Sequence, residues 1–320
     1  MASRKKMLII CGKKRKYMKI ELIYNPNSGG GRGKNLAPVI IKSLEDKGYN
    51  LNVHKTEYHE HAIKIVRHLD LTNTDILVSV GGDGTMYEVL NGLFKNEKSD
   101  KKPYFAVIPV GTGNSFSQDL NMHKWKDGLF AILNGSTKAI DIMKFNTEGE
   151  DYYSINALGI GLPSDVCITG NKHKKILGKF SYTSSALLEI IRYKAHHTIL
   201  EVDGVTHEYM GAFTNFSNTR IFGGNMMISP DSVLDDGEIE AVVLLDAPKG
   251  TIIKALPTLY TGKHIDNPYV KVYKGKHFKI TTNPVKVANP EGEIFGVTPL
   301  EITVMPKAIE MFYLPDKMTK

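Results

Sequence analysis

The sequence predicts an α/β domain followed by a β-rich domain, and three observations lead to this prediction. Strand-like and helix-like segments alternate from residue 19 to about residue 140, which is typical of a parallel sheet with helices on both faces. From about residue 141, short runs of alternating apolar and polar residues dominate, as in an antiparallel sandwich or barrel. Three glycine-bearing loops directly follow strands of the first half.

The totals are those of an ordinary globular protein with room for two domains. The chain has 320 residues, of which 42% are hydrophobic and 23% are charged. No apolar run approaches the length of a membrane span. The two cysteines, Cys11 and Cys167, are too far apart for a zinc-site spacing and give no disulfide framework, which fits a reducing, cytoplasmic compartment.

The positive charge is concentrated at the start of the chain. Eight of the 41 basic residues lie within residues 1–19, which contain no acid, so the rest of the chain is close to neutral. Such a run is most often a solvated, disordered segment. The alternative is an electrostatic contact with an anionic membrane surface, worth about 1 kcal/mol per basic residue. No nucleic-acid-binding module accompanies the run, so we expect no nucleic-acid partner.

We expect four segments along the chain. They are a basic tail at 1–18, the α/β domain at 19–140, the β-rich domain at 141–306, and a C-terminal segment at 307–320 that can return to the first domain.

The α/β domain is predicted from a regular succession of segments. The expected strands are Ile20–Tyr24, Leu51–His54, Ile76–Val80 and Tyr104–Val110. The expected helices start near Asn35 and behind Thr85, and cover Glu60–Leu69 and Trp125–Leu133.

The stretch Gly81-Gly-Asp-Gly-Thr85 follows an apolar run that is typical of a strand buried on both faces. Thr85 and Glu88 have the spacing of a capping box, which predicts a helix start. A glycine-rich turn between a strand and a helix exposes backbone N–H groups that suit a phosphate. Asp83 would repel a phosphate unless a cation stands between them, so it indicates Mg²⁺ held with a nucleotide. A plain surface turn remains the alternative.

Two further loops, 25–33 and 111–116, also follow strands directly. Because the carboxyl ends of parallel strands meet at one edge of a sheet, we expect all three loops to converge there. Their convergence is stronger evidence for a binding site than any one loop.

The β-rich domain is predicted from short alternating runs, with Asp203-Gly204 as a hairpin turn. One helix is expected at about Tyr182–Lys194, preceded by a solvated loop at Asn171–Lys175. The expected strands are Ile199–Val202, Glu208–Phe213, Glu238–Leu245, Tyr269–Tyr273, Phe278–Thr282, Val285–Ala288 and Leu300–Met305.

Five motifs in a fixed order resemble the lipid kinases of the diacylglycerol kinase and sphingosine kinase type, including the bacterial diacylglycerol kinase catalytic-domain proteins. They are Asn25-Pro-Asn-Ser-Gly29, Gly81-Gly-Asp-Gly-Thr85, Pro109-Val-Gly-Thr-Gly-Asn114, Leu234-Asp-Asp-Gly237 and Glu291-Gly-Glu293. The resemblance implies a nucleotide-binding α/β domain, a β-rich lipid-substrate domain and an active site in the cleft between them. It also implies an ATP- and Mg²⁺-dependent transfer of the γ-phosphoryl group to a lipid hydroxyl.

The resemblance assigns roles to individual residues. Asp83 would hold the catalytic Mg²⁺, Glu293 would be the general base, and Asp236 would hold a structural Mg²⁺ or simply belong to a tight turn. The nucleotide would be bound by Asn25, Ser28, Gly29, Gly81, Gly82, Gly84, Thr85, Thr112 and Asn114.

Three positions depart from the family pattern. Glu291 stands where the family has Asp, which keeps the charge and lengthens the side chain. Ser115 stands where many diacylglycerol-kinase-like members have Asp, and small residues there are found on the sphingosine-kinase side. Gln118 replaces a frequent Arg, although Ser115 and Gln118 still have capping-box spacing.

Two other functions stay open at this point. One is a kinase for a soluble acceptor such as NAD, and the other is a nucleotide-binding regulator that has lost catalysis. The expected partners are a membrane lipid substrate, an anionic membrane surface and, as an open alternative, a second copy in a homodimer.

Overall fold

The computed structural model describes residues 18–177 and 181–315, apart from the side chains of residues 173–183. Nearly all of the predicted basic tail therefore lies outside the described residues. Within the described part of the chain, no helix is long and apolar enough to cross a bilayer.

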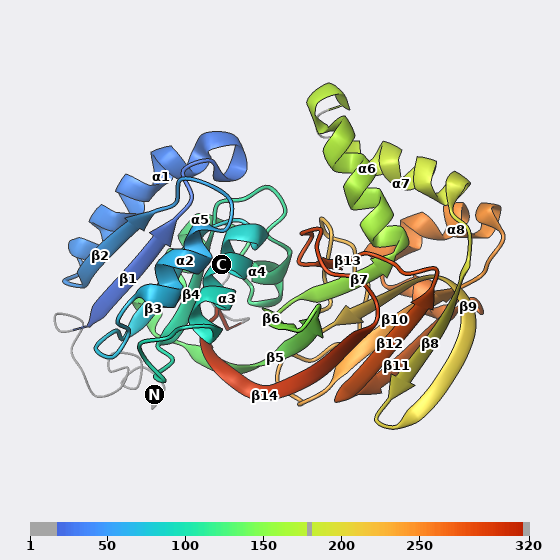
Figure 1. Ribbon diagram of the computed structural model, residues 1–320. Coiled ribbons are helices and arrows are strands. Elements are labelled where there is room, and N and C mark those ends of the chain that lie inside the picture. The colour runs from blue at the N-terminus through green and yellow to red at the C-terminus, as the bar shows by residue number, and fades with distance from the viewer. Residues whose placement is uncertain (1–17, 178–180, 316–320) are drawn as a thin grey trace, which may run out of the picture. The chain divides into compact units, whose positions relative to one another are not determined.

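The chain divides into two compact units, and the first comprises Met1–Ile140 with Lys307–Lys320. Its sheet is parallel and has the strand order β2-β1-β3-β4-β14, and Figure 1 shows the helices around it. The elements are β1 (Lys19–Tyr24), α1 (Ser28–Glu45), β2 (Asn50–Lys55), α2 (His61–His68), β3 (Ile76–Gly81), α3 (Asp83–Phe94), β4 (Tyr104–Pro109), α4 (Ser115–Asp119), α5 (Trp125–Asn134) and the end of β14 (Leu300–Phe312).

The strand order explains why helices lie on both faces of this sheet. The connection through α1 runs from β1 outward to β2, and the connection through α2 runs back across β1 to β3. Because crossovers between parallel strands are right-handed, opposite directions place the two helices on opposite faces. All six residues of β3 are buried, as expected for a strand between β1 and β4 that is covered on both sides.

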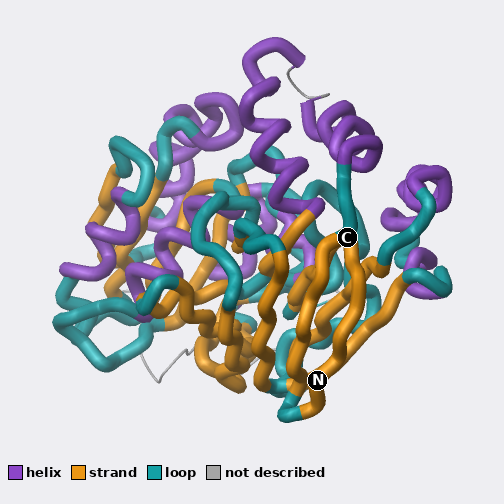
Figure 2. The backbone as a smooth tube through the Cα atoms, turned by 45° about the vertical axis from the view of Figure 1, so that its right-hand side comes forward, coloured by secondary structure: helices purple, strands orange, loops and turns teal. Residues whose placement is uncertain are grey.

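The second unit is Asp141–Pro306. One run of neighbouring strands has the order β11-β10-β9-β8-β12-β14, while β7 pairs with β9 and β13, and β5 pairs with β6 and β14. Figure 2 draws the strands of the chain in orange. The elements are β5 (Thr137–Thr147), β6 (Glu150–Ser154), β7 (Ala157–Gly161), α6 (Leu162–Leu177), α7 (Ser181–Arg192), β8 (His196–Val202), β9 (Val205–Ser217), β10 (Ile239–Leu245), α8 (Lys249–Ala255), two short 3₁₀ helices (Leu256–Tyr260 and Lys263–Asp266), β11 (Val270–Gly275), β12 (His277–Asn283), β13 (Ala288–Pro290) and β14.

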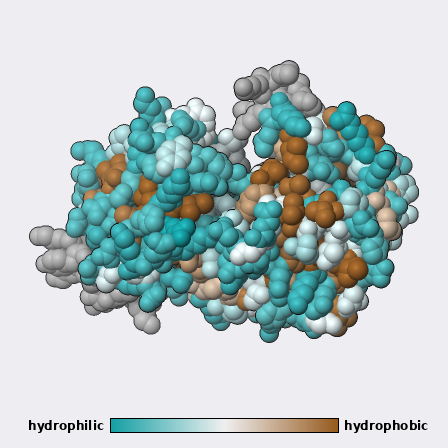
Figure 3. Space-filling view, viewed as in Figure 1, coloured by the Kyte–Doolittle hydropathy of each residue, from teal (hydrophilic) through white to brown (hydrophobic). Residues whose placement is uncertain are grey.

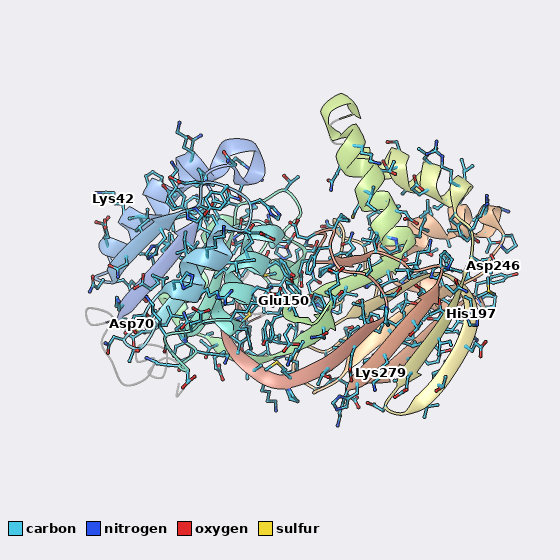
Figure 4. The ribbon with its side chains drawn as sticks, in the orientation of Figure 1. Lys42, Asp70, Glu150, His197, Asp246 and Lys279 are labelled. Atoms are coloured by element: carbon cyan, nitrogen blue, oxygen red, sulfur yellow. The ribbon has the colours of Figure 1, made fainter. Side chains whose placement is uncertain are left out.

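The core of the second unit follows the period-two pattern of its strands. In β12 buried and exposed residues alternate without a break, which places Phe278 and Ile280 inside. The rings of Phe216 and Phe278 meet edge to face at 5.3 Å in this core. Charged side chains take the outer positions, such as Lys279 on β12 and, in the first unit, Lys42 on α1 (Figure 4). The predicted fold class, α/β followed by a β-rich domain, is confirmed.

Some predicted elements were wrong. The segment Asn171–Lys175 was expected to be a loop, but its backbone belongs to α6. The sequence showed one helix in the second half, whereas the structure has α6, α7 and α8. Polar residues and a glycine in α6 mask its apolar stripe, although Pro163 near its start is a signal for a helix beginning.

Candidate active site

The three predicted loops do converge at the carboxyl edge of the first unit's sheet. The carbonyl oxygen of Gly81 accepts hydrogen bonds from the N–H groups of Val110 (2.7 Å) and Gly111 (3.1 Å). The N–H of Asn25 donates to the carbonyl oxygen of Val80 at 3.1 Å. Backbone hydrogen bonds therefore tie the loops after β1, β3 and β4 together, as expected for loops that directly follow parallel strands.

Close backbone contact explains why glycine stands in each loop. A Cβ atom on Gly111 would lie 2.4 Å from the Cα of Gly82, and one on Gly29 would lie 2.3 Å from the carbonyl oxygen of Val110. Any larger residue would push the loops apart. The resulting surface has backbone N–H groups at the end of a strand and at the start of α3, which is the arrangement that binds phosphate.

A group of hydroxyl and amide side chains joins the first two loops. The Nδ2 of Asn25 donates to the Oγ1 of Thr85 at 3.3 Å, and the hydroxyl of Ser28 lies 3.5 Å from the same atom. Thr85 is buried, whereas Thr112 of the third loop is exposed and Gly84 is half-buried. The predicted nucleotide-binding residues thus lie around one edge, with Thr112 at its surface.

Asn114 takes a left-handed conformation, with φ of 53°, at the start of α4. Its Nδ2 donates to the carbonyl oxygen of Gly111 at 2.8 Å, while its buried Oδ1 has no partner among the described residues. A buried acceptor without a donor is costly, so this oxygen suits a donor from a ligand or an ordered water.

Asp83 is the first residue of α3, and its carboxylate reaches the third loop. The N–H of Ser115 donates to Oδ2 at 3.1 Å. Burial raises the pKa of the Asp83 carboxyl above its ordinary value, and backbone N–H groups of residues 114–116 act in the opposite direction. A desolvated carboxylate beside N–H groups can hold a cation that a nucleotide brings with it.

Arg32 is a candidate residue that sequence reasoning missed. Its guanidinium donates to the carbonyl oxygens of Gly29 (3.2 Å) and Gly111 (2.6 Å), so it links the first and third loops. The φ angles of Gly29, Gly30 and Gly31 are all positive, which breaks the helix before α1 proper and turns the chain so that Arg32 can reach back. A positive charge at a phosphate-binding edge supports the same chemistry.

Both predicted capping boxes were wrong. Neither α3 nor α4 has a side-chain hydrogen bond at its N-cap, which is Gly82 in one helix and Asn114 in the other. The carboxylate of Glu88 instead accepts the N–H groups of Glu60 (2.9 Å) and Ala62 (3.1 Å) at the start of α2. A tertiary partner therefore replaces the local one that the spacing suggested.

The residues of this edge fit a nucleotide with Mg²⁺. A Cβ atom on Gly30 or Gly31 of the first loop would meet nothing within 4 Å, so the backbone there is open on that side. The described residues contain no group of three metal-binding side chains. Mg²⁺ usually takes one or two carboxylates, waters and substrate phosphates, so Asp83 with a nucleotide is a sufficient donor set.

In the second unit, Glu291 and Glu293 have different surroundings. Glu291 is buried, and its Oε1 accepts the hydroxyl of Ser154 and the N–H groups of Ile155 (2.9 Å) and Asn156 (2.7 Å). Glu293 is half-buried, and its N–H closes a turn on Pro290 at 2.8 Å. Glu291 therefore fixes the turn from which Glu293 extends. The Glu side chain, which is longer than the Asp of the family pattern, makes these hydrogen bonds with residues 154–156.

Asp236 lies in an ion pair and in a local turn. Its Oδ2 lies 2.7 Å from the Nζ of Lys274, and its Oδ1 accepts the N–H of Glu238 at 3.1 Å. The hydrogen bond to Asp236 raises the pKa of Lys274, so the ammonium stays charged. The turn is further held by Asp141, whose Oδ2 accepts the N–H of Gly237 at 2.6 Å. Whether Asp236 also holds a structural Mg²⁺ stays a prediction.

Comparisons with known proteins cover nearly all of the described chain. Residues 19–145 match the diacylglycerol kinase catalytic domain, and residues 156–313 match the YegS C-terminal NAD kinase beta sandwich-like domain. The chain is similar to a diacylglycerol kinase of Bacillus subtilis (strain 168), with 28% identity over 92% of this chain and 96% of the relative.

Two further similar proteins are also named as diacylglycerol kinases. A diacylglycerol kinase of Staphylococcus aureus (strain bovine RF122 / ET3-1) is 28% identical over 91% of each chain. The crystal structure of a diacylglycerol kinase from Bacillus anthracis str. Sterne superposes with a TM-score of 0.78 at 26% identity, and covers 95% of this chain and 100% of that one.

Proposed function

Because the chain belongs to the diacylglycerol kinase catalytic-domain family with a YegS-type C-terminal domain, we propose that this kinase transfers the γ-phosphoryl group of ATP to a lipid hydroxyl of the diacylglycerol type. The convergence of the loops at residues 25–33, 81–85 and 111–116 carries this proposal, because that edge combines a phosphate cradle with a carboxylate. The names of the curated relatives favour diacylglycerol over a sphingoid base as the acceptor.

Each residue has a stated role in the proposed reaction. The backbone groups of Gly81, Gly82 and Gly84 bind phosphate oxygens, and Asp83 holds Mg²⁺, which neutralises phosphate charge when it is bound. Glu293 accepts the proton of the lipid hydroxyl as the general base. Arg32 adds positive charge at the phosphates from the first loop.

Phosphoryl transfer needs mainly positioning and charge neutralisation from the protein. The backbone hydrogen bonds that tie the loops together supply that positioning, because they hold the phosphate-binding groups without side-chain rotation. Asn25, Ser28, Thr85 and Asn114 would fix the nucleotide further through their hydroxyl and amide groups, with Thr112 at the exposed rim.

The decisive experiment is a transfer assay with radiolabelled ATP and Mg²⁺ against a panel of acceptors. The panel contains diacylglycerol, a sphingoid base, ceramide, phosphatidylglycerol and NAD. We expect label in phosphatidic acid. Label in NADP alone would show a kinase for a soluble acceptor, and no label in any acceptor, with nucleotide still bound, would show a regulator.

We further propose that the protein works at the cytoplasmic face of an anionic membrane, with the basic residues of segment 1–19 as its electrostatic contact. Deleting residues 1–17 should weaken binding to vesicles that contain phosphatidylglycerol at low salt, without changing binding to neutral vesicles. Equal binding of both chains to the anionic vesicles would contradict this part of the proposal.

A further inference from the structure

The second unit contains a buried amide group whose polar atoms are not satisfied. Asn289 lies in β13 and is fully buried. Neither its Nδ2 nor its Oδ1 has a nitrogen or oxygen partner among the described residues. Leaving buried amide atoms without partners costs about 1–3 kcal/mol per group, so a sequence that keeps Asn there needs a reason.

Sheet register shows which way this side chain points. Asn289 pairs with Gly159 of β7, and Gly159 pairs with Asn215 of β9. Residues directly opposite each other in antiparallel strands share a face, so the three positions form one row. A Cβ on Gly159 would lie 3.0 Å from the Cβ of Pro163, which places the row under the start of α6.

Cys167, on α6, interacts with the side chains of both Asn289 and Glu293. Burial raises the pKa of the Cys167 thiol above its ordinary value, an interaction with the Asn289 side chain lowers it, and the charge of Glu293 raises it. Because α6 packs against β13, the thiol lies on the side of the row that carries Asn289. The negative charge of Glu293, the proposed general base, is near enough to act on the same thiol.

Apolar side chains continue from this polar group beneath the helices. A cluster on the same part of the fold packs α6 and α7 against β9, β10 and α8, and its buried members are Leu162, Ile190, Ala212, Leu244, Ala247 and Ile252. Figure 3 shows hydrophobic residues gathered where Figure 1 labels α6 and β7. On the outside of this core, α7 exposes the apolar side chains of Leu187 (39%) and Ile191 (57%). A polar group with exposed apolar side chains on the same part of the fold suits a lipid alcohol, which has a polar hydroxyl and an apolar chain.

We propose that Asn289 is an acceptor-binding residue, whose amide hydrogen-bonds the polar end of the lipid beside Cys167 and Glu293. This inference rests on the proposed lipid kinase function. In the reaction the lipid oxygen forms a bond to the γ-phosphorus, the bond from that phosphorus to the β–γ bridging oxygen breaks, ADP leaves, and the hydroxyl proton passes to the Glu293 carboxylate. Asn289 holds the lipid for this step and takes no proton.

The first test uses Asn289→Leu, which keeps the branched outline of four side-chain heavy atoms and has no polar atoms. Because it removes unsatisfied groups, it should keep or raise the melting temperature, while the KM for diacylglycerol rises about tenfold or more and the KM for ATP stays constant. Asn215→Leu is the matched control in the same row. Asn215 already donates to the hydroxyl of Ser217 at 2.7 Å, so its loss should lower the melting temperature.

The outcomes of this test are distinct. A parental KM for diacylglycerol in Asn289→Leu would overturn the proposal. A lower melting temperature together with lower activity would do so too, because Asn289 would then serve the fold.

The second test measures binding without turnover. In a Cys11→Ser background the remaining thiol is Cys167, and its alkylation by N-ethylmaleimide is followed by mass spectrometry. Detergent micelles that contain dioctanoylglycerol should slow alkylation several-fold, whereas empty micelles and ATP should not. Equal rates in both micelles would overturn the proposal even if the enzyme phosphorylates diacylglycerol. Protection without any phosphorylation would support the site and contradict the proposed function.

Discussion

The Oδ2 atom of Asp83 accepts a hydrogen bond from the backbone N–H of Ser115 at 3.1 Å, so the carboxylate in the second loop is held by the third. The same carboxylate is desolvated enough for its pKa to be raised. Asp83 is therefore placed by N–H groups and destabilised by burial, and a cation would relieve the burial cost. This combination is more typical of a functional site than of a surface turn.

Asp83→Asn should lower the rate of phosphoryl transfer by about two orders of magnitude or more, because the neutral amide holds a cation much more weakly than the carboxylate does. Its effect on stability should have a particular pH dependence. Burial raises the folded pKa, so the contribution of Asp83 to the free energy of unfolding is full below its ordinary value of 3.8 and falls as pH rises through the folded pKa. The variant should therefore gain stability relative to the parent as pH rises.

Asp70→Asn is the control with the opposite sign. Asp70 is exposed, and the pKa of its carboxyl is lowered by hydrogen bonds from Thr72, first from the side-chain hydroxyl and then from the backbone N–H, which lies 2.9 Å from Oδ1. That stabilisation is present above the ordinary pKa and is lost as pH falls. Thermal unfolding of both variants from acid to neutral pH checks the pair, and identical pH trends would contradict the interpretation of Asp83.

Gly111→Ala should separate the second and third loops, because its Cβ would lie 2.4 Å from the Cα of Gly82. We expect nucleotide affinity to fall about tenfold and stability to fall by about 1–3 kcal/mol, as in other overpacked sites. Gly250→Ala on α8 is the control, since its Cβ meets nothing within 4 Å. Titration with a fluorescent ATP analogue would show the difference, and parental affinity in Gly111→Ala would mean that the loops can move apart freely.

Glu88→Ala should destabilise the protein by about 1 kcal/mol with little change in nucleotide affinity, because Glu88 caps α2 and does not face the phosphate edge. Glu57→Ala removes an exposed carboxylate just before the same helix and should be nearly neutral. Urea unfolding measures both. A strong loss of nucleotide binding in Glu88→Ala would contradict a role limited to capping α2.

These residues show which parts of the structure sequence patterns could predict. The β3 strand and its loop were predictable because a strand buried on both faces is an uninterrupted apolar run and the loop follows it directly. The hydrogen-bond partners of Glu88 were not predictable. Thr85 and Glu88 have the spacing of a local cap, whereas the N–H groups that Glu88 actually binds lie 26 and 28 residues away along the chain. The tertiary fold, and not the local spacing, determines which N–H groups Glu88 binds.

The same reasoning applies to the candidate site. Arg32 reaches Gly111 because three successive glycines turn the backbone, and no residue spacing encodes that reach. Asn289 gave no signal in the sequence, since its importance lies in amide atoms that have no nitrogen or oxygen partner among the described residues once the strands are paired. Motif residues were found because they recur in a family, and residues that act through one chain's own packing were not.

Glu291→Gln and Glu293→Gln should separate stability from activity. Glu291 accepts three hydrogen bonds as a buried carboxylate, so its amide variant should lose about 2 kcal/mol of stability or more. Glu293→Gln should keep the parental melting temperature and nucleotide affinity and lose phosphoryl transfer. Near-parental transfer by the second variant would show that Glu293 is not the base.

Glu293→Gln should also change the chemistry of Cys167. Burial is the main reason that the thiol pKa is raised, and the negative charge of Glu293 adds to it. Removing that charge should lower the thiol pKa, so that more thiolate is present at a given pH and N-ethylmaleimide reacts faster. The midpoint of the rate-against-pH curve should move to lower pH.

Glu301→Gln removes a surface carboxylate 3.7 Å from Lys279 and is the control for a general change in charge. It should leave the Cys167 curve in place, in the same Cys11→Ser background. If the curves of parent, Glu293→Gln and Glu301→Gln coincide, Glu293 does not lie beside the thiol, and Asn289 then has no base next to it. A shift in Glu293→Gln alone would place the base, the thiol and the amide in one site by a measurement that needs no substrate.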